Sequence, residues 1–216
     1  MTLLPAGDGV KTVYVRFKDA AGNISDPVSA SITVITTKPT GTIAFTTPNP
    51  SNLPYAVMTL SATSANGQVT QMRFSRDGVN YLAFEPYATT KSMTLLPAGE
   101  GVKTVYVRFR DVIGNVSDPI SASITVDTTQ PTGTIAFSTP NPTTSATGTL
   151  ELTATDASGV TQMQFSTNGV NYLPFEPFGA TRDVALALGV NNISVRFKDA
   201  AGNVSTAVSA TITRNP

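Results

Sequence analysis

The sequence predicts an all-β fold made of tandem β-sandwiches with about seven short strands each. Apolar residues recur at every second position along many short stretches, which is the pattern of half-buried strands. Gly, Asn, Asp and Pro separate these stretches at short intervals, as expected for turns. One stretch occurs three times, as GVKTVYVRFKDAAGN at 9–23, GVKTVYVRFRDVIGN at 101–115 and GVNNISVRFKDAAGN at 189–203. The chain is therefore a repeat array, and its fold follows from one repeat.

The repeated stretch predicts a strand that ends in a tight turn. In the middle copy, Val105, Val107 and Phe109 alternate with Tyr and Arg residues, so one face of the strand is apolar. The stretch then reaches Asp, Gly and Asn, which accept positive φ or bond to their own backbone. The residues at 120–126 alternate again, so two strands form a hairpin around the turn. We expect structural turn roles for Asp19, Gly22, Asn23, Gly114, Asn115, Gly202 and Asn203.

The equivalence of the copies sets the domain organisation. Phe17, Phe109 and Phe197 occupy the same place in a repeat whose period is about 90 residues. The joints read TTKPTG and TTQPTG, and the proline of each fixes φ, so we expect short and fairly stiff joints. We predict the C-terminal part of an incomplete repeat at 1–36, a complete repeat at 37–128 and a second complete repeat at 129–216.

A complete repeat accounts for seven strands. In the middle repeat we expect strands at 41–45, 57–62, 69–74, 81–87 and 92–95, followed by the hairpin already described. The dipeptides Asp77-Gly78 and Asn168-Gly169 occupy equivalent places and are hairpin signals. This count and spacing are those of an immunoglobulin-like (fibronectin III-like) sandwich.

The last repeat follows the same plan, and its inward faces can be named from the alternation. Residues that share the apolar face of each stretch should form one core between two sheets. These residues are Ile135, Phe137, Leu150, Leu152, Ala154, Met163, Phe165, Val184, Leu186, Leu188, Ile193, Val195, Phe197, Val208, Ala210 and Ile212.

Composition excludes several classes of function. The 216 residues hold 14 Lys plus Arg against 14 Asp plus Glu, so no basic surface for nucleic acid is expected. There is no Cys and no His, which removes thiol nucleophiles, histidine general bases and Cys/His zinc sites. No apolar stretch approaches the roughly 20 residues that span a bilayer, so no membrane span is expected. The sequence therefore predicts a protein that is not an enzyme.

The stretch RFSRDGVNYLAFEPYATTKSMTLLPAGEGVKTVYVRFRDVIGNVSD at 73–118 resembles the bacterial Ig-like repeats of multidomain surface and secreted proteins. The carrying pieces are the DGVN or NGVN hairpin, the FEPY or FEPF after it, the VRF strand with its turn, and the joint. The resemblance implies an extracellular or cell-surface structural module: a rigid stalk, spacer or fibre component, with adhesion as a related role. The alternative is a carbohydrate- or protein-binding accessory module of a secreted enzyme or adhesin.

Calcium is the one cofactor that the sequence suggests. Asp111, Asp199 and the equivalent Asp19 could offer oxygens to calcium, although an Asp that caps its own turn needs only a backbone partner. Asp127 is a further candidate because it lies at a joint, where neighbouring repeats could add oxygens. Its equivalent in the first joint is Ile35, which favours the alternative of an exposed joint residue.

Two sets of aromatic residues are candidate ligand-binding residues. Rings of this kind can stack on sugars, but near a sandwich edge they more often close the core. In similar repeats the places of Tyr81 and Phe84 are often Trp, and this chain has no Trp. The candidates are Tyr81, Phe84, Tyr87, Tyr172, Phe175 and Phe178.

The incomplete first repeat raises the question of partners. Its apolar face, with Val13, Val15 and Phe17, needs a second sheet, because a lone hairpin with such a face should be unstable or sticky. Either the sequence is a stretch of a longer array, or another copy of the chain completes the repeat in a filament. The expected partners are thus neighbouring repeats of the same chain, with other copies, a glycan or a surface protein as alternatives.

Overall fold

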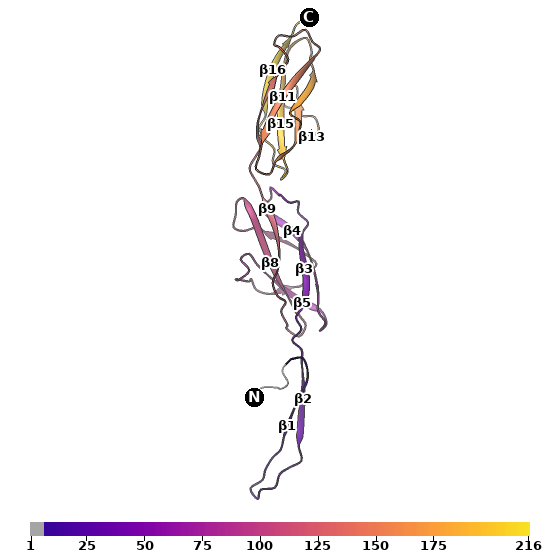
Figure 1. Cartoon of the computed structure of the whole chain (residues 1–216), viewed down its shortest axis with the longest axis vertical. Coiled ribbons are helices and arrows are strands. Elements are labelled where there is room, and N and C mark those ends of the chain that lie inside the picture. The colour runs from indigo at the N-terminus through magenta and orange to yellow at the C-terminus, as the bar shows by residue number, and fades with distance from the viewer. Residues whose placement is uncertain (1–6) are drawn as a thin grey trace. The chain divides into compact units, whose positions relative to one another are not determined.

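The computed structural model describes residues 7–216 and consists of strands joined by turns and loops (Figure 1). Nothing in this part of the chain forms a helix, so none there has the length and apolar character to cross a bilayer. Backbone contacts group the chain into two compact units. One runs up to Ala44 and adds Met58–Lys91 and Thr104–Ala122, and the other consists of Phe45–Val57, Ser92–Lys103 and Ser123–Pro216. The boundaries expected at 36 and 128 stay predictions.

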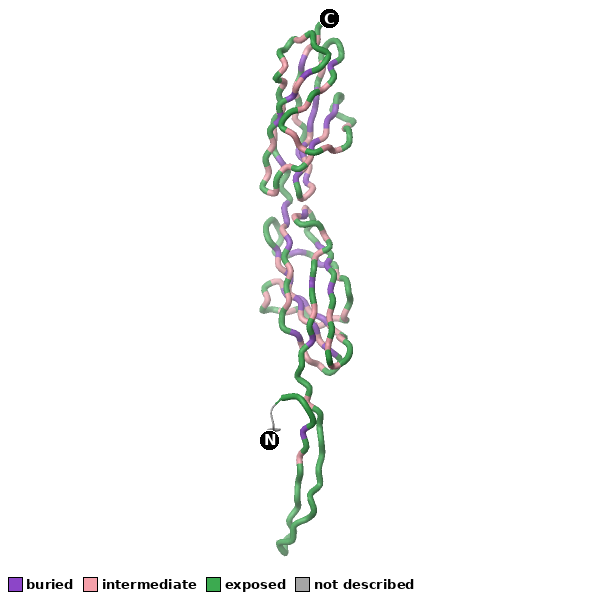
Figure 2. Tube along the Cα trace, turned by 45° about the vertical axis from the view of Figure 1, so that its right-hand side comes forward, coloured by how far each residue is buried: buried purple, intermediate pink, exposed green. Residues whose placement is uncertain are grey.

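The first two strands, β1 (Gly9–Val15) and β2 (Val28–Val34), form an antiparallel hairpin that makes a sheet by itself. Figure 2 shows it exposed along most of its length. Val15 is 45% exposed and Phe17, just past β1, is 63% exposed. Among the described residues, no second sheet covers this apolar face.

Seven strands follow in the middle of the chain and form two sheets. In chain order they are β3 (Thr40–Phe45), β4 (Tyr55–Thr63), β5 (Val69–Ser75), β6 (Glu85–Pro86), β7 (Thr90–Thr94), β8 (Gly101–Asp111) and β9 (Ile120–Val126). One sheet has the order β3-β4-β7 and the other the order β6-β5-β8-β9. The sheets face each other closely, since a Cβ added to Gly41 of β3 would lie 2.6 Å from the Phe109 ring of β8. Glycine at this position therefore permits the close approach.

The last seven strands repeat this arrangement. They are β10 (Thr132–Phe137), β11 (Thr147–Thr155), β12 (Val160–Ser166), β13 (Glu176–Pro177), β14 (Thr181–Ala185), β15 (Gly189–Asp199) and β16 (Val208–Arg214). Their sheets have the orders β10-β11-β14 and β13-β12-β15-β16, which confirms the predicted sandwich plan. The buried core comprises Leu150, Leu152, Met163, Phe165, Ile193, Val195 and Phe197. All seven were expected from the alternation.

Two details differ from the expectation. The strand expected at 81–87 is reduced to β6, because Asp77 accepts the amide hydrogens of Val79 and Asn80 in a local turn, and Pro86 has no N–H to donate. Leu188, expected to face inward, is 63% exposed. It lies in the turn after β14, where the alternation of the strand no longer applies.

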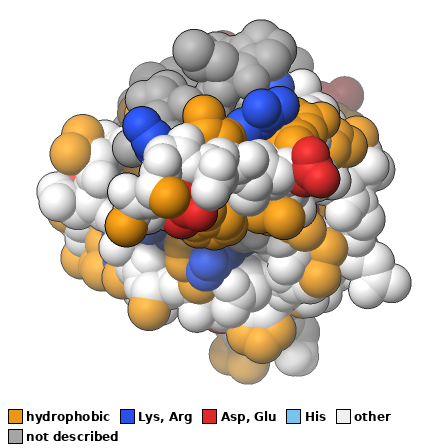
Figure 3. Space-filling view, turned by 90° about the horizontal axis from the view of Figure 1, so that it is seen from below, with side chains coloured by type: hydrophobic (Ala, Val, Ile, Leu, Met, Phe, Trp, Pro, Cys, Tyr) orange, Lys and Arg blue, Asp and Glu red, His pale blue; other side chains and the backbone are white. Residues whose placement is uncertain are grey.

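Charged side chains are few and scattered on the face shown in Figure 3, among apolar and uncharged polar ones. Glu85 and Glu176 occupy equivalent places in the two complete repeats, and each forms an ion pair with a residue close to it in the sequence. Glu85 Oε2 lies 2.7 Å from Lys91 Nζ, and Glu176 Oε1 lies 2.8 Å from Arg182 Nη1. Because an equivalent ion pair recurs in both sandwiches, we interpret it as a structural contact between neighbouring segments.

Candidate metal centre

Three aspartates from separate parts of the chain come together where strands end. Asp127 directly follows β9, Asp156 directly follows β11, and Asp199 is the last residue of β15. One carboxylate oxygen from each lies within 4.8 Å of the others. All three residues belong to the same compact unit. Three negative charges so close together repel one another unless positive charge lies among them.

Burial raises the free-energy cost of holding these negative charges close together. Asp127 is 6% exposed and Asp199 is 2% exposed, whereas Asp156 lies partly open to solvent. The Oδ1 atom of Asp127 accepts the backbone N–H of Thr129 at 3.0 Å. Its Oδ2 atom is buried and has no hydrogen-bond partner. An unpaired buried carboxylate oxygen is costly, so its position beside two further carboxylates indicates a cation.

Local hydrogen bonds hold the other two carboxylates in fixed directions. Asp199 Oδ1 accepts the backbone N–H groups of Gly202 (2.7 Å) and Asn203 (2.8 Å). The Nδ2 group of Asn203 donates to Asp199 Oδ2 at 2.8 Å and to the Asp127 carbonyl at 2.9 Å. Asp156 Oδ1 accepts the N–H (2.8 Å) and hydroxyl (2.9 Å) of Ser158. Because a carboxylate oxygen can accept more than one bond, these groups are positioned and keep capacity for a metal.

A fourth carboxylate, that of Glu100, lies beside this cluster. It accepts hydrogen bonds from the Thr129 hydroxyl and from the Thr128 hydroxyl (3.1 Å) and backbone N–H (3.2 Å). The Thr129 and Thr128 hydroxyls hold the pKa of Glu100 below its usual value, while the charge of Asp127 acts in the opposite direction. Glu100 and Asp127 also line one hollow with Ala157 and Ser158, which gives an approach from solvent.

The donor set fits a hard divalent cation. Carboxylates alone form it, and calcium takes about six to eight oxygen ligands, some from water. Magnesium prefers one or two carboxylates and several waters, and zinc favours nitrogen and sulfur. The partly open side at Asp156 leaves room for water ligands. Calcium is therefore the best match to these residues.

Sequence patterns located two of the three aspartates. Asp127 and Asp199 were candidates, and the structure places them together. The alternative of an exposed Asp127 is wrong, because its joint folds against Asn203. Asp156 was missed, since an Asp after a strand is also an ordinary turn residue. Alignment of the two complete repeats could have indicated Asp156, because it stands at the place of Ser64, and Asp127 likewise stands at the place of Ile35 in the first joint.

Asp111 belongs to no group of three acidic side chains in the described part of the chain. Its Oδ2 atom accepts the Ser64 hydroxyl (3.0 Å) and the Asn66 amide (3.2 Å). Each of the equivalent aspartates also accepts the backbone N–H of the Asn four residues later at 2.8 Å, as Asp19 does from Asn23 and Asp111 from Asn115. The contrast therefore lies at Asp111, which the Ser64 hydroxyl approaches where the Asp156 carboxylate approaches Asp199.

The aromatic candidates divide into two kinds. Tyr87 packs edge-on against Phe109 and Phe178 against Phe197, with ring centroids 5.9 and 6.0 Å apart. The other rings lie under cationic groups. Arg73 lies over Tyr81 and Phe84, Arg108 over Tyr81, Arg110 over Phe84, Arg196 over Tyr172 and Lys198 over Phe175. Cations thus lie over the four rings that a sugar would have to reach.

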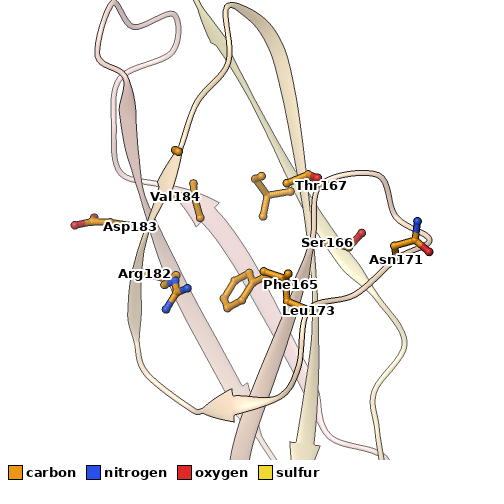
Figure 4. Close-up of a pocket in the computed structure, with 10 residues that line it drawn as sticks. Phe165, Ser166, Thr167, Asn171, Leu173, Arg182, Asp183 and Val184 are labelled. Atoms are coloured by element: carbon orange, nitrogen blue, oxygen red, sulfur yellow. The ribbon is translucent and has the colours of Figure 1, made fainter.

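A separate hollow opens in the last sandwich between β12 and β14 (Figure 4). Phe165 and Val184 point into it, and Asp183 points away. Val184 stands at the place of the buried Met93 in the middle sandwich. The smaller side chain leaves unfilled space, so we attribute this hollow to packing.

Comparison with known proteins gives one relative and several similar folds. No protein-family model matches the chain. Exoglucanase B of Cellulomonas fimi is 33% identical over an alignment 224 positions long, gaps included, and the alignment covers 91% of this chain. The chain spans 19% of the length of that relative.

Solved structures with similar folds include the fibronectin(III)-like modules of Clostridium thermocellum CbhA, with 17% identity and a TM-score of 0.48 over 80% of this chain and 94% of that one. The FN1-FN3 domains of chicken CNTN1 show 12% identity and a TM-score of 0.47 over 95% and 76% of the two chains. The strand orders carry the assignment: the chain consists of tandem immunoglobulin-like, fibronectin III-like β-sandwich repeats, with the predicted resemblance to bacterial Ig-like repeats.

Proposed function

We propose that this chain is a non-catalytic structural module of an extracellular bacterial protein, in which its sandwiches act as a stalk or spacer. The observation that carries the proposal is the repetition of one seven-stranded plan in β3–β9 and β10–β16. The side chains that recur in it, such as Phe109 and Phe197, serve packing. A spacer needs this kind of repeated stable unit, and it needs no reactive group.

Stretching single molecules of the chain tests the mechanical part of this proposal. Two unfolding events of nearly equal contour length are expected, one for each complete repeat.

A release assay with soluble and insoluble glucans tests the absence of catalysis, and no sugar release is expected. Release that scales with the concentration of the purified chain would overturn the proposal.

An accessory binding module of a secreted enzyme is the second candidate. The likeness to a part of Exoglucanase B favours it. Depletion of the chain from solution by insoluble cellulose is the direct measurement. If the module binds through its aromatic rings, Tyr172→Ala and Tyr81→Ala weaken depletion together, and Tyr14→Ala, at an exposed ring of the first hairpin, serves as the control.

We infer further that Asp127, Asp156 and Asp199 bind calcium and that the ion stabilises the folded module. The unpaired Asp127 Oδ2 and the closeness of the three carboxylates support this site. An ion that binds only the folded state stabilises it, by about 2.7 kcal/mol at a concentration 100 times the dissociation constant. Extracellular modules typically bind calcium with millimolar or submillimolar affinity.

Calorimetric titration of the full chain with calcium tests the site. We expect one site that is lost in Asp156→Ser and retained in Glu151→Gln, a change at an exposed residue of β11. Magnesium should bind more weakly. A chain that binds no calcium, or an Asp156→Ser variant that binds as the wild type does, would show that the three carboxylates are not a calcium site.

A further inference from the structure

The two joints of the chain are equivalent in sequence and share part of their hydrogen bonding. The first joint segment is Ile35–Pro39 and the second is Asp127–Pro131. In the first, the Thr36 N–H donates to Asp8 (2.7 Å), and in the second the Thr128 N–H donates to Glu100 (3.2 Å). An Asn side chain also donates to the first carbonyl of each segment. Asn115 Nδ2 lies 3.2 Å from the Ile35 carbonyl oxygen, and Asn203 Nδ2 lies 2.9 Å from that of Asp127. The two segments thus share these two attachments, and in the second the Asp127 N–H also donates to the Ser51 carbonyl at 3.0 Å.

The first joint segment has two further direct attachments. Asn66 Nδ2 donates to the Thr37 carbonyl at 2.6 Å. Lys38 Nζ lies 2.6 Å from Asp118 Oδ1 in an ion pair. Both attachments come from protein side chains and need no added ion.

The second joint segment has lost the residues that make these attachments. Gln130 and Thr206 stand at the places of Lys38 and Asp118, so the ion pair cannot form. Ser158 stands at the place of Asn66, and its hydroxyl donates to Asp156 at 2.9 Å. Asn66 thus reaches the first joint segment with its side-chain amide, whereas the shorter Ser158 bonds to its neighbour Asp156.

Two carboxylates appear where these attachments are lost. Asp127 replaces Ile35, and Asp156 replaces Ser64. At the first joint, Ser64 donates to Asp111 at 3.0 Å. At the second, Asp156 can only add negative charge beside Asp199, and Asp127 adds more. Without a cation this charge pushes the second joint segment away from the ends of β11 and β15.

We infer that the second joint segment is held by a divalent cation and the first by direct side-chain contacts, so that removal of the cation releases one joint and leaves the other in place. This inference rests on the proposed calcium site. Calcium concentration then controls the order of one joint in a chain whose other joint does not respond to it.

Hydrogen exchange on the full chain, with calcium and with a chelator, tests this inference. The amides of Asp127, Thr128 and Thr129 all donate hydrogen bonds, so their exchange reports the order of the second joint segment. We expect calcium to slow their exchange about tenfold or more, and to change the Thr36 amide by less than about twofold. The amides of β15 report whether the sandwich stays folded.

Matched variants are obtained by exchanging the residues that differ between the equivalent places of the two joints. The double variant Asp127→Ile with Asp156→Ser should lose the calcium response of the second joint segment. The reverse double variant, Ile35→Asp with Ser64→Asp, should create a calcium response at Thr36. If the β15 amides of the first variant lose protection, the reverse variant still provides the test.

The outcomes separate this inference from the proposed site. Calcium binding by calorimetry with no change in exchange at either joint, or with equal changes at both, would overturn the inference and leave the site standing. The absence of calcium binding would overturn both. Slowed exchange at the second joint alone supports both.

Discussion

At the residue scale, burial separates three equivalent phenylalanines. Phe109 and Phe197 are 0% exposed, whereas Phe17 is 63% exposed. We predict that Phe109→Ala or Phe197→Ala lowers the free energy of unfolding of its sandwich by about 3–5 kcal/mol, because a buried ring leaves a cavity. Phe17→Ala, the matched control, should cost less than about 0.5 kcal/mol. Denaturant unfolding followed by backbone circular dichroism measures the difference. Equal losses for Phe17 and Phe109 would contradict it.

Asp77 gives one hairpin a sensitivity to acid that its counterpart lacks. Hydrogen bonds from the Asn80 side chain and then from the Asn80 and Val79 backbone lower the Asp77 pKa. A carboxyl whose folded pKa is depressed adds stability above its unfolded value, about 3.9, and this contribution is lost as pH falls through the folded pKa. We predict that the Val79 and Asn80 amide resonances stay constant through the ordinary pKa range of Asp, near about 4, and shift only at much lower pH, where the depressed pKa of Asp77 is reached. The Val170 and Asn171 resonances should not shift, because Asn168 does not titrate there.

Asp77→Asn is the control for this titration. It keeps the turn acceptor that Asn168 provides in the last sandwich, where Asn168 Oδ1 accepts the N–H groups of Val170 (2.9 Å) and Asn171 (2.8 Å). The variant should fold and lose the acid shift. Movement of both hairpins together in the wild type would point to general acid unfolding.

At the element scale, the equivalent strands β7 and β14 fill their sandwiches differently. Met93 on β7 is buried, and Val184 on β14 borders the hollow in Figure 4. We predict that Val184→Met raises the free energy of unfolding of the last sandwich by about 0.5–2 kcal/mol, since added methylene groups fill space beside Phe165. Thermal unfolding measures the change, and Thr181→Met, at an exposed position of β14, is the control. A lower melting temperature would mean that the hollow is too narrow and the core is overpacked.

At the scale of the whole molecule, the β1–β2 hairpin exposes an apolar face. Val15, Phe17 and Ile32 are each at least 45% exposed. We predict that the full chain associates with itself as its concentration rises and that a chain without residues 1–36 does not, because apolar faces and unpaired strand edges drive association. Light scattering across a wide concentration range measures this. Full and shortened chains with the same monomeric mass at every concentration would rule out this face as an assembly surface.

Much of the fold was predictable because the rules that govern it are local. Val105, Val107 and Phe109 alternate in sequence, and the period of a strand places them on one buried face. Turn chemistry was less complete. The strand expected at 81–87 shrank to two residues, because hydrogen bonds to Asp77 shape the preceding turn, and Pro86 lacks a donor.

The sequence by itself determined the repeat, the sandwich plan and the inward faces, because alternation and turn residues act within a few positions along the chain. Only the tertiary structure decided that Asp156 meets Asp127 and Asp199, which lie far apart in sequence and come together because β9, β11 and β15 end at the same place. It also decided that Asp127 is buried. Burial depends on which segment folds over a residue, and no local pattern specifies that.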